Sequence, residues 1–351
     1  DPSAPPNARY KLVGSELFPI PSSGTIWGAC SGDGIHWTAC DQPVLARYAD
    51  NVGSAAYDPV QGNYVAYIRR YLNTGYGELL VGDHPVRGAW RGRAISRIES
   101  ENFRQWSYPE LVVAPDLEDG LDTDLHLGAY CRYEGAENAH FMFISMVRHR
   151  KSQPGISDVQ VAVSRDNRHW IRPTRQPLIV HGPVGSFDES RVDPAPGFVW
   201  IGEDHLALYI RNEGFPADRE PSGGHPLGGA MSRVVMRRDR IVGIEAGPEG
   251  GSICTRPLIF SGRRLLLNLE PTGADAQLRV QILSPAPGGK GPVPSAFSGY
   301  SLDDCVPLTQ DELDAVVRWE GGAEVGRWAG QPVRLQVHLR SMRLYAFQFS
   351  D

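Results

Sequence analysis

The chain has 351 residues, of which 41% are hydrophobic and 22% charged, so it is long enough for two domains and apolar enough to exclude a disordered protein. The formal net charge of −6 provides no positive field of the kind that holds a nucleic-acid backbone, and we expect no nucleic-acid partner. No apolar run of about 18 residues occurs, so we expect no membrane association. The 39 glycines and 28 prolines favour many short elements joined by turns.

The chain opens on Asp1-Pro2 without an initiator Met, so we expect any signal peptide to lie upstream and the protein to be secreted or periplasmic. Its five cysteines are too few and too scattered for a disulfide scaffold or a CxxC metal site. Cys30 and Cys40 lie at a spacing that allows a bridge across a hairpin, and the sequence leaves this bridge open.

A seven-residue box, Ser-x-Asp/Asn-x-x-x-Trp, is the strongest repeat in the chain. It occurs at Ser31–Trp37, Ser100–Trp106 and Ser164–Trp170, at spacings of 69 and 64 residues, with a degenerate copy near Arg237–Asp239. A β-rich apolar run precedes each copy, and these runs are Tyr10–Val13, Tyr64–Arg69, Phe141–Arg148 and Leu206–Arg211. Four short antiparallel strands, here called A to D, that repeat at this period are typical of a β-propeller blade.

The boxes end strand C of each predicted blade, and the apolar runs form strand B. Strand A is expected at Gly53–Tyr57, Leu127–Tyr133 and Ala195–Trp200, and Tyr108–Ala114 is an example of strand D. We count four blades in residues 1–248, the first without most of its strand A. Because an open edge needs a partner, either the ring has four blades or a fifth lies upstream of Asp1, and we favour the second alternative.

Residues 249–351 are predicted to form a second all-β domain, a β-sandwich. Its expected strands are Arg263–Leu269, Leu278–Leu283, Ala315–Trp319, Val333–Leu339 and Leu344–Phe349. Thr309–Glu312 is an alternative helix start, because it matches a capping box.

The boxes, the following Pro109–Pro115 segment and the appended sandwich resemble the five-bladed propeller glycoside hydrolases of families 32 and 43. A closer resemblance, over nearly the whole chain, is to bacterial proteins labelled family-32-like. The segments that carry it are Tyr57–Pro59, Tyr64–Arg69, Thr255–Pro257, Gly299–Ser301, Asp304, Trp319–Gly322 and Leu344–Phe347. The catalytic sequence blocks of family 32 are absent, so the resemblance implies the fold and a carbohydrate substrate but not the catalytic residues.

Propeller geometry assigns the charged residues to two faces. The starts of strands A and the ends of strands B open on one face, and the boxes open on the other. We therefore expect Asp33, Asn102 and Asp166 to stabilise turns by bonding backbone amides, with the Trp packed between blades. The boxes are also expected to lie on the face opposite any pocket.

Carboxylates gather near the predicted starts of strands A. Glycoside cleavage requires one carboxylic acid and one carboxylate, and a ring of such groups supplies both. The candidate catalytic residues are Asp50, Asp124, Asp188 and Glu189. We expect Asp188 or Glu189 to point into the cleft, oriented by Arg191. The alternative is that the starts of strands are polar for solvation alone.

The candidate substrate-binding residues are those whose side chains donate hydrogen bonds near the same face: Asn51, Arg69, His126, Arg148, Arg191, Arg211 and His225. Sugar-stacking aromatics are expected among Tyr71, Tyr76, Trp90 and Phe215. His126, His181 and His225 lack HxH or HExxH spacing, so no metal site is predicted. No nucleotide-binding motif occurs, and we expect no cofactor.

Three functions remain open. The main hypothesis is a glycoside hydrolase that cleaves a poly- or oligosaccharide. The second is a carbohydrate-binding propeller without turnover. The third is a phosphate-using relative, because Arg69, Arg148, Arg211 and His126 are able to hold phosphate.

Overall fold

The computed structural model describes residues 1, 3–14, 25–45, 51–72, 79–81, 84–86, 92–120, 122–136, 138–150, 153–213, 229–285 and 294–351. The described chain is all-β, with two single 3-10 turns at η1 (Pro6–Ala8) and η3 (Gly326–Trp328), which confirms the predicted class. It divides into two compact units, residues 1–199 with 207–235 (unit 1) and residues 200–206 with 236–351 (unit 2). In the described part of the chain, no helix is long and apolar enough to cross a membrane.

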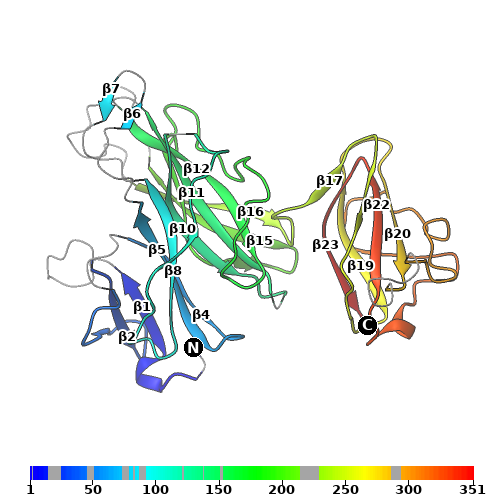
Figure 1. Ribbon diagram of the computed structural model, residues 1–351, viewed down its shortest axis with the longest axis horizontal. Coiled ribbons are helices and arrows are strands. Elements are labelled where there is room, and N and C mark those ends of the chain that lie inside the picture. The colour runs from blue at the N-terminus through cyan, green and yellow to red at the C-terminus, as the bar shows by residue number, and fades with distance from the viewer. Residues whose placement is uncertain are drawn as a thin grey trace. The chain divides into compact units, whose positions relative to one another are not determined.

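Antiparallel sheets follow one another along the first two thirds of the chain (Figure 1). The first sheet contains β1 (Tyr10–Gly14), β2 (Trp27–Ser31) and β3 (Thr38–Ala39). The second contains β4 (Val52–Asp58), β5 (Asn63–Tyr71), β8 (Arg93–Ser100) and β9 (Glu110–Val113). The third contains β10 (Thr123–Arg132), β11 (His140–Arg150) and β12 (Gln153–Ser164). The fourth contains β13 (Arg191–Pro194), β14 (Val199–Ile201), β15 (His205–Glu213) and β16 (Gly229–Arg237), and β6 (Leu79–Val81) pairs separately with β7 (His84–Val86).

The predicted four-stranded unit is confirmed in the second sheet, whose order β4-β5-β8-β9 matches strands A to D. In the third sheet, single bridges from Val159 to Ile179 and from Val163 to Ile171 stand in place of a continuous fourth strand. The first sheet has three strands among the described residues, β1, β2 and β3, and the number of blades stays a prediction.

Strand β5 is buried on both faces, which explains its unbroken apolar run. Val65 and Tyr67 belong to a core shared with the third sheet, whereas Ala66 and Ile68 belong to a core shared with the first sheet. Successive side chains of a strand point to opposite faces, so one apolar run supplies two cores. Glycine is needed at position 53, where β4 approaches β10, because a Cβ there would lie 2.6 Å from the carbonyl oxygen of Gly128.

The boxes form the predicted turns. Asp33 Oδ1 accepts hydrogen bonds from the backbone of Ile35 and His36, both at 2.8 Å. Asn102 Oδ1 accepts from residues 104 and 105 at 2.9 Å, and Asp166 Oδ1 from residues 168 and 169 at 3.0 and 2.8 Å. The turn-stabilising role is therefore confirmed in all three copies.

The fourth position of each box adopts a left-handed backbone. The φ angles of Gly34, Phe103 and Asn167 are 78°, 63° and 53°. Glycine adopts this conformation without strain and asparagine does so more readily than other residues, whereas Phe103, which is buried, is held in it by its surroundings. Trp106 and Trp170 pack against the cores on either side of the second sheet, as predicted, while Trp37 is 37% exposed.

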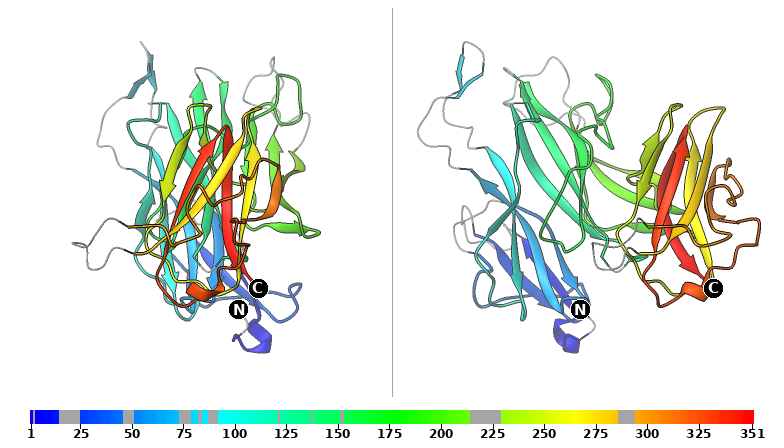
Figure 2. Two further views of the ribbon diagram at one scale, coloured as in Figure 1. Left: turned by 90° about the vertical axis from the view of Figure 1, so that its right-hand side faces the viewer. Right: turned by 45° about the vertical axis from the view of Figure 1, so that its right-hand side comes forward.

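Unit 2 contains two antiparallel sheets (Figure 2). One has the order β17 (Ile244–Ala246), β23 (Met342–Ser350), β19 (Arg264–Pro271) and β21 (Glu312–Val316), and the other β18 (Gly251–Cys254), β22 (Arg334–Arg340) and β20 (Gln277–Leu283). Leu267 of the first sheet and Val280 of the second belong to one core with Trp319, which is 2% exposed.

Four of the five predicted strands of this region form close to their expected positions, and the fifth is shifted, because β21 ends before Trp319. The short strands β17 and β18 were missed. The alternative helix at Thr309–Glu312 is wrong, since β21 starts at Glu312 and pairs with β19 instead. All five cysteines are free thiols, so Cys30 and Cys40 are not bridged.

Candidate active site

Asp124 lies at the start of β10 in the third sheet, next to strand β8 of the second sheet. Its side chain is 6% exposed, and its Oδ1 accepts a hydrogen bond from the backbone nitrogen of Arg93 at 2.9 Å. The Nε of Arg93 lies 3.8 Å from the other carboxylate oxygen. Asp124 is therefore held by a neighbouring sheet, with a cation beside it.

His126 and Arg69 join this cluster. The Nη1 of Arg69 lies 2.9 Å from His126 Nδ1, and the Nη1 of Arg93 lies 3.3 Å from the same atom. Because a guanidinium only donates, Nδ1 accepts, and the imidazole carries its proton on Nε2. The backbone oxygen of Asn51 accepts from the Arg69 nitrogen at 3.0 Å.

Four predicted site residues are thus close together: Asn51, Arg69, Asp124 and His126. Sequence reasoning missed Arg93, which pairs with Tyr71 across β5 and β8. The signal for it was available, because the start of strand C lies beside the end of strand B.

The third sheet contributes a separate ion pair. Arg148 of β11 forms an ion pair with Asp158 of β12, and Asp158 is 5% exposed. The other oxygen of Asp158 accepts from the backbone nitrogen of His181 at 2.9 Å. The predicted cation Arg148 therefore has an acidic neighbour that sequence reasoning did not single out.

Asp193 of β13 is a second buried aspartate near the start of an inner strand, and it is 3% exposed. Its Oδ1 accepts from the hydroxyl of Ser145 in β11 at 2.7 Å, and its Oδ2 lies 3.8 Å from Nη1 of Arg211. The predicted residue Arg211 of β15 thus lies near a carboxylate, and the predicted residue Arg191 is the first residue of β13.

The two acidic residues before β13 differ in their partners. Asp188 accepts from the hydroxyl of Ser186 within its own loop at 2.7 Å. Glu189 is 8% exposed, and one of its oxygens accepts from the backbone nitrogen of Gly185. Its buried Oε1 has no hydrogen-bond partner among the described residues.

The remaining sequence candidates are Asp50, Tyr76, Trp90, Phe215 and His225, and they lie outside the described residues. Whether Asp50 joins the carboxylates of the second and third sheets stays a prediction. Within the described residues, no three His, Cys, Asp or Glu side chains gather as metal ligands would.

Two pockets lined by described residues of unit 1 lie at the end of the strands that carries the boxes. The first, of about 230 Å³, is lined by Phe103 and Trp106 of the second box, among others. The second, of about 390 Å³, is lined by Ser100 and Asn102. The expectation that the boxes lie opposite any pocket is therefore wrong for the second box, because its turn lines the second pocket together with Arg168 of the third box.

No protein-family model and no curated protein matches the chain. Among solved structures, an N-acetylgalactosamine deacetylase from F. plautii in complex with blood group B trisaccharide is 14% identical, with a TM-score of 0.44 over 62% of this chain and 66% of that one. A β-1,2-mannobiose phosphorylase from Listeria innocua is 17% identical, with a TM-score of 0.36 over 54% and 45%. A glycosyl hydrolase from Bacteroides ovatus is 15% identical, with a TM-score of 0.39 over 65% and 64%. The matches span less than two thirds of each solved chain, and at these scores they carry no conclusion about this chain's activity.

Proposed function

We propose that the protein is a glycoside hydrolase that cleaves a poly- or oligosaccharide with a carboxylate acid/base pair. The observation that carries the proposal is the placement of buried aspartates near the starts of two successive inner strands. Asp124 on β10 and Asp193 on β13 each have an arginine within 3.8 Å. Such a pattern fits a polar site at one end of the sheets better than solvation, because solvated carboxylates are not buried.

Within this site, the roles follow from the partners. Asp124 is our candidate for the base or nucleophile, because the backbone nitrogen of Arg93 holds its carboxylate in place and the guanidinium of Arg93 lies beside it. Glu189 is our candidate for the group that donates a proton to the leaving oxygen, because it lies just before β13 and its buried Oε1 has no hydrogen-bond partner among the described residues. A separation of roughly 5–9.5 Å between the two carboxyl groups would match known glycosidases.

The proposed architecture is a β-propeller over residues 1–248 followed by a β-sandwich over residues 249–351, of the kind found in families 32 and 43. Successive antiparallel sheets in unit 1 and two sheets around one core in unit 2 support it. In this proposal the protein is secreted or periplasmic and bacterial, and its partner is a carbohydrate.

One observation favours a second candidate, a phosphate-using reaction at the same site. Arg69 and Arg93 both reach His126 Nδ1, so two guanidinium groups and an imidazole lie side by side at this site. Two guanidiniums beside an imidazole N–H are the donor set that binds a phosphate group. In that reaction phosphate, in place of water, attacks the sugar carbon.

The test is a screen of plant, algal and microbial polysaccharides and oligosaccharides, with products analysed in the presence and absence of inorganic phosphate. On the substrate that is cleaved, Asp124→Asn and Glu189→Gln should each lower kcat at least about 100-fold, the usual contribution of general acid–base catalysis. Glu134→Gln, an exposed carboxylate at the opposite ends of the strands, is the matched control.

Each outcome selects one function. Free sugar without phosphate supports hydrolysis, and a sugar phosphate formed only with phosphate supports the second candidate. Full activity in both variants would contradict the roles of Asp124 and Glu189. Saccharide binding without any product would support the carbohydrate-binding alternative.

A further inference from the structure

The pocket of about 390 Å³ at the box end of unit 1 has no part in the proposed chemistry. All seven of its lining residues are polar, and six of them are Asn63, Glu99, Glu101, Asn102, Gln105 and Arg168. Its volume lies within the range of small-molecule sites. The pocket is therefore large enough for a ligand, and that ligand must be polar.

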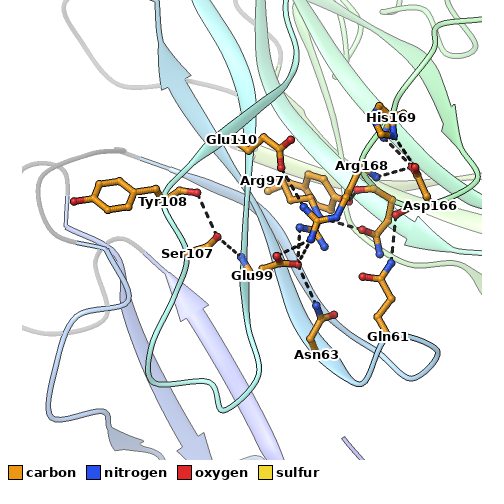
Figure 3. A network of polar contacts seen from close by, with 12 residues as sticks. Gln61, Asn63, Arg97, Glu99, Ser107, Tyr108, Glu110, Asp166, Arg168 and His169 are labelled. Atoms are coloured by element: carbon orange, nitrogen blue, oxygen red, sulfur yellow. Dashed lines mark hydrogen bonds and ion pairs between the residues drawn. The ribbon is translucent and has the colours of Figure 1, made fainter.

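The inner wall is rigid because Glu99 is held from three sides (Figure 3). Arg168 Nη2 lies 2.6 Å from both of its oxygens, and Arg97 Nη1 lies 2.8 Å from Oε2. The amide of Asn63 donates to the same oxygen at 3.1 Å. Partial burial opposes ionisation, but the hydrogen bonds from the two arginines outweigh it and hold the pKa of Glu99 below its usual value.

The charges of the inner wall cancel, so this wall favours neither an anion nor a cation. Arg168 also pairs with Glu110 at 3.2 Å, so its charge is matched by two carboxylates and is poorly suited to bind an anion. Glu99 is matched by two arginines and is poorly suited to bind a cation. No cluster of three metal-binding side chains occurs in the described residues, which argues against a metal.

The outer wall offers hydrogen-bonding groups that are not used within the protein. The side chains of Glu101 and Gln105 are exposed and make no hydrogen bond or ion pair among the described residues. Asn102 uses its oxygen to anchor the turn, which leaves its amide hydrogens to face a ligand. Carboxylate acceptors beside amide donors suit hydroxyl groups, since each hydroxyl both donates and accepts.

We propose that this pocket is a second saccharide site, which binds a neutral sugar unit at a distance from the reaction. The sugar as ligand class rests on the proposed function, whereas the neutral, hydroxyl-rich character rests on the pocket itself. Asn63 opens β5 and Arg69 lies six residues further along the same strand. At about 3.3 Å per residue, the two sites are about 20 Å apart along this strand, at its opposite ends.

The experiment measures binding of neutral hexasaccharides of glucose, mannose, galactose, xylose and arabinose by saturation-transfer NMR and calorimetry. The full chain carries Asp124→Asn, so that hydrolysis does not deplete the probe. In this background, the double substitution Glu101→Ala and Gln105→Ala should raise the Kd for the hexasaccharide that binds by at least about tenfold, because hydrogen bonds to the saccharide are lost. Glu134→Ala, at the same end of the strands, should leave the affinity unchanged.

The pocket variant is also tested in the otherwise native chain, where its kcat on a short substrate should match that of the parent. Unchanged affinity in the pocket variant, or no binding of any probe, would overturn the proposal. A protein that binds hexasaccharides through the pocket but cleaves no saccharide would refute the proposed function and leave the second site standing. A protein that cleaves a saccharide and whose pocket variant binds the hexasaccharide with unaltered affinity would support the proposed function and refute the second site.

Discussion

The two ends of the sheets in unit 1 use the same acidic side chain in opposite ways. At the box end, Asp33 and Asp166 accept hydrogen bonds from backbone nitrogens two and three residues away. At the other end, Asp124 and Asp193 accept from groups of neighbouring strands, and each has an arginine nearby. A carboxylate that stabilises its own turn is fixed by local structure, whereas one held by another strand is a property of the packed sheets.

This difference predicts that changes at the box end alter stability and changes at the other end alter activity. The box end also contains an exception, the fourth position of the third box. Asn167 is fully buried, accepts from Arg97 Nε at 3.0 Å and donates to Asp58 Oδ2 at 2.6 Å. It therefore connects two sheets, although it belongs to a local turn.

The largest effect on stability is expected for Asn167→Ala. The variant loses two hydrogen bonds to charged groups and leaves both partners buried, and alanine also fits poorly at a φ of 53°. We expect a loss of about 3–5 kcal/mol in the free energy of unfolding, measured by urea denaturation. Asn167→Gly keeps the backbone conformation and should be less destabilising by about 1 kcal/mol. A loss below about 1 kcal/mol in the alanine variant would show that the link between the sheets contributes little.

A smaller effect is expected for Asp166→Ala, which removes only contacts within the turn. The loss should be about 1 kcal/mol, as for the side chain that caps a helix start. Asp166→Asn should be nearly neutral, because the second box carries Asn102 at the equivalent position and forms the same turn. The same urea titration compares both variants, and kcat should be unaltered in each. A decrease in kcat would break the division between the two ends.

The smallest effect is a pH dependence within the third box. The hydrogen bond that His169 donates to the carboxylate of Asp166 raises the pKa of His169, and the charge of Glu110 acts in the same direction. Burial disfavours the ionised form of Asp166, but the hydrogen bonds from His169 and the backbone outweigh it and lower the pKa of Asp166. Because the pKa of His169 is raised on folding, the histidine contributes to the free energy of unfolding fully at pH values below its unfolded pKa of about 6.5, and this contribution is lost as the pH rises through the folded pKa. The pKa of Asp166 is lowered on folding, so its contribution is lost only in acid.

The measurement is the Tm of the parent chain and of His169→Gln at pH 5.5 and at pH 8.5. The variant should be less stable than the parent at the lower pH, and the difference should shrink at the higher pH. The matched control is Gln105→Ala, because the second box has a non-titrating glutamine at the equivalent position. Its difference in Tm should be the same at both pH values. An equal difference for His169→Gln at both pH values would contradict the charged pair.

Much of unit 1 was predictable from the sequence because its signals are local. The box at Ser164–Trp170 makes its own turn through bonds that span two or three residues, so the pattern of residues specifies the structure. The apolar run Tyr64–Arg69 predicted a strand, and β5 forms there. The short strands β17 and β18 lacked such a run, and they form because β23 and β22 offer them a partner.

The sequence by itself determined the repeated boxes, the strands around them and the acidic residues at the starts of inner strands. It identified Asp124, His126 and Arg69 as candidates but not that Arg93 lies among them, and it did not identify the network of Arg97, Glu99 and Arg168. Their contacts join residues that are 33 to 69 positions apart in the chain. Only the tertiary structure decided their contacts, because a side-chain contact between sheets depends on the register and packing of both sheets and leaves no periodic pattern in either segment.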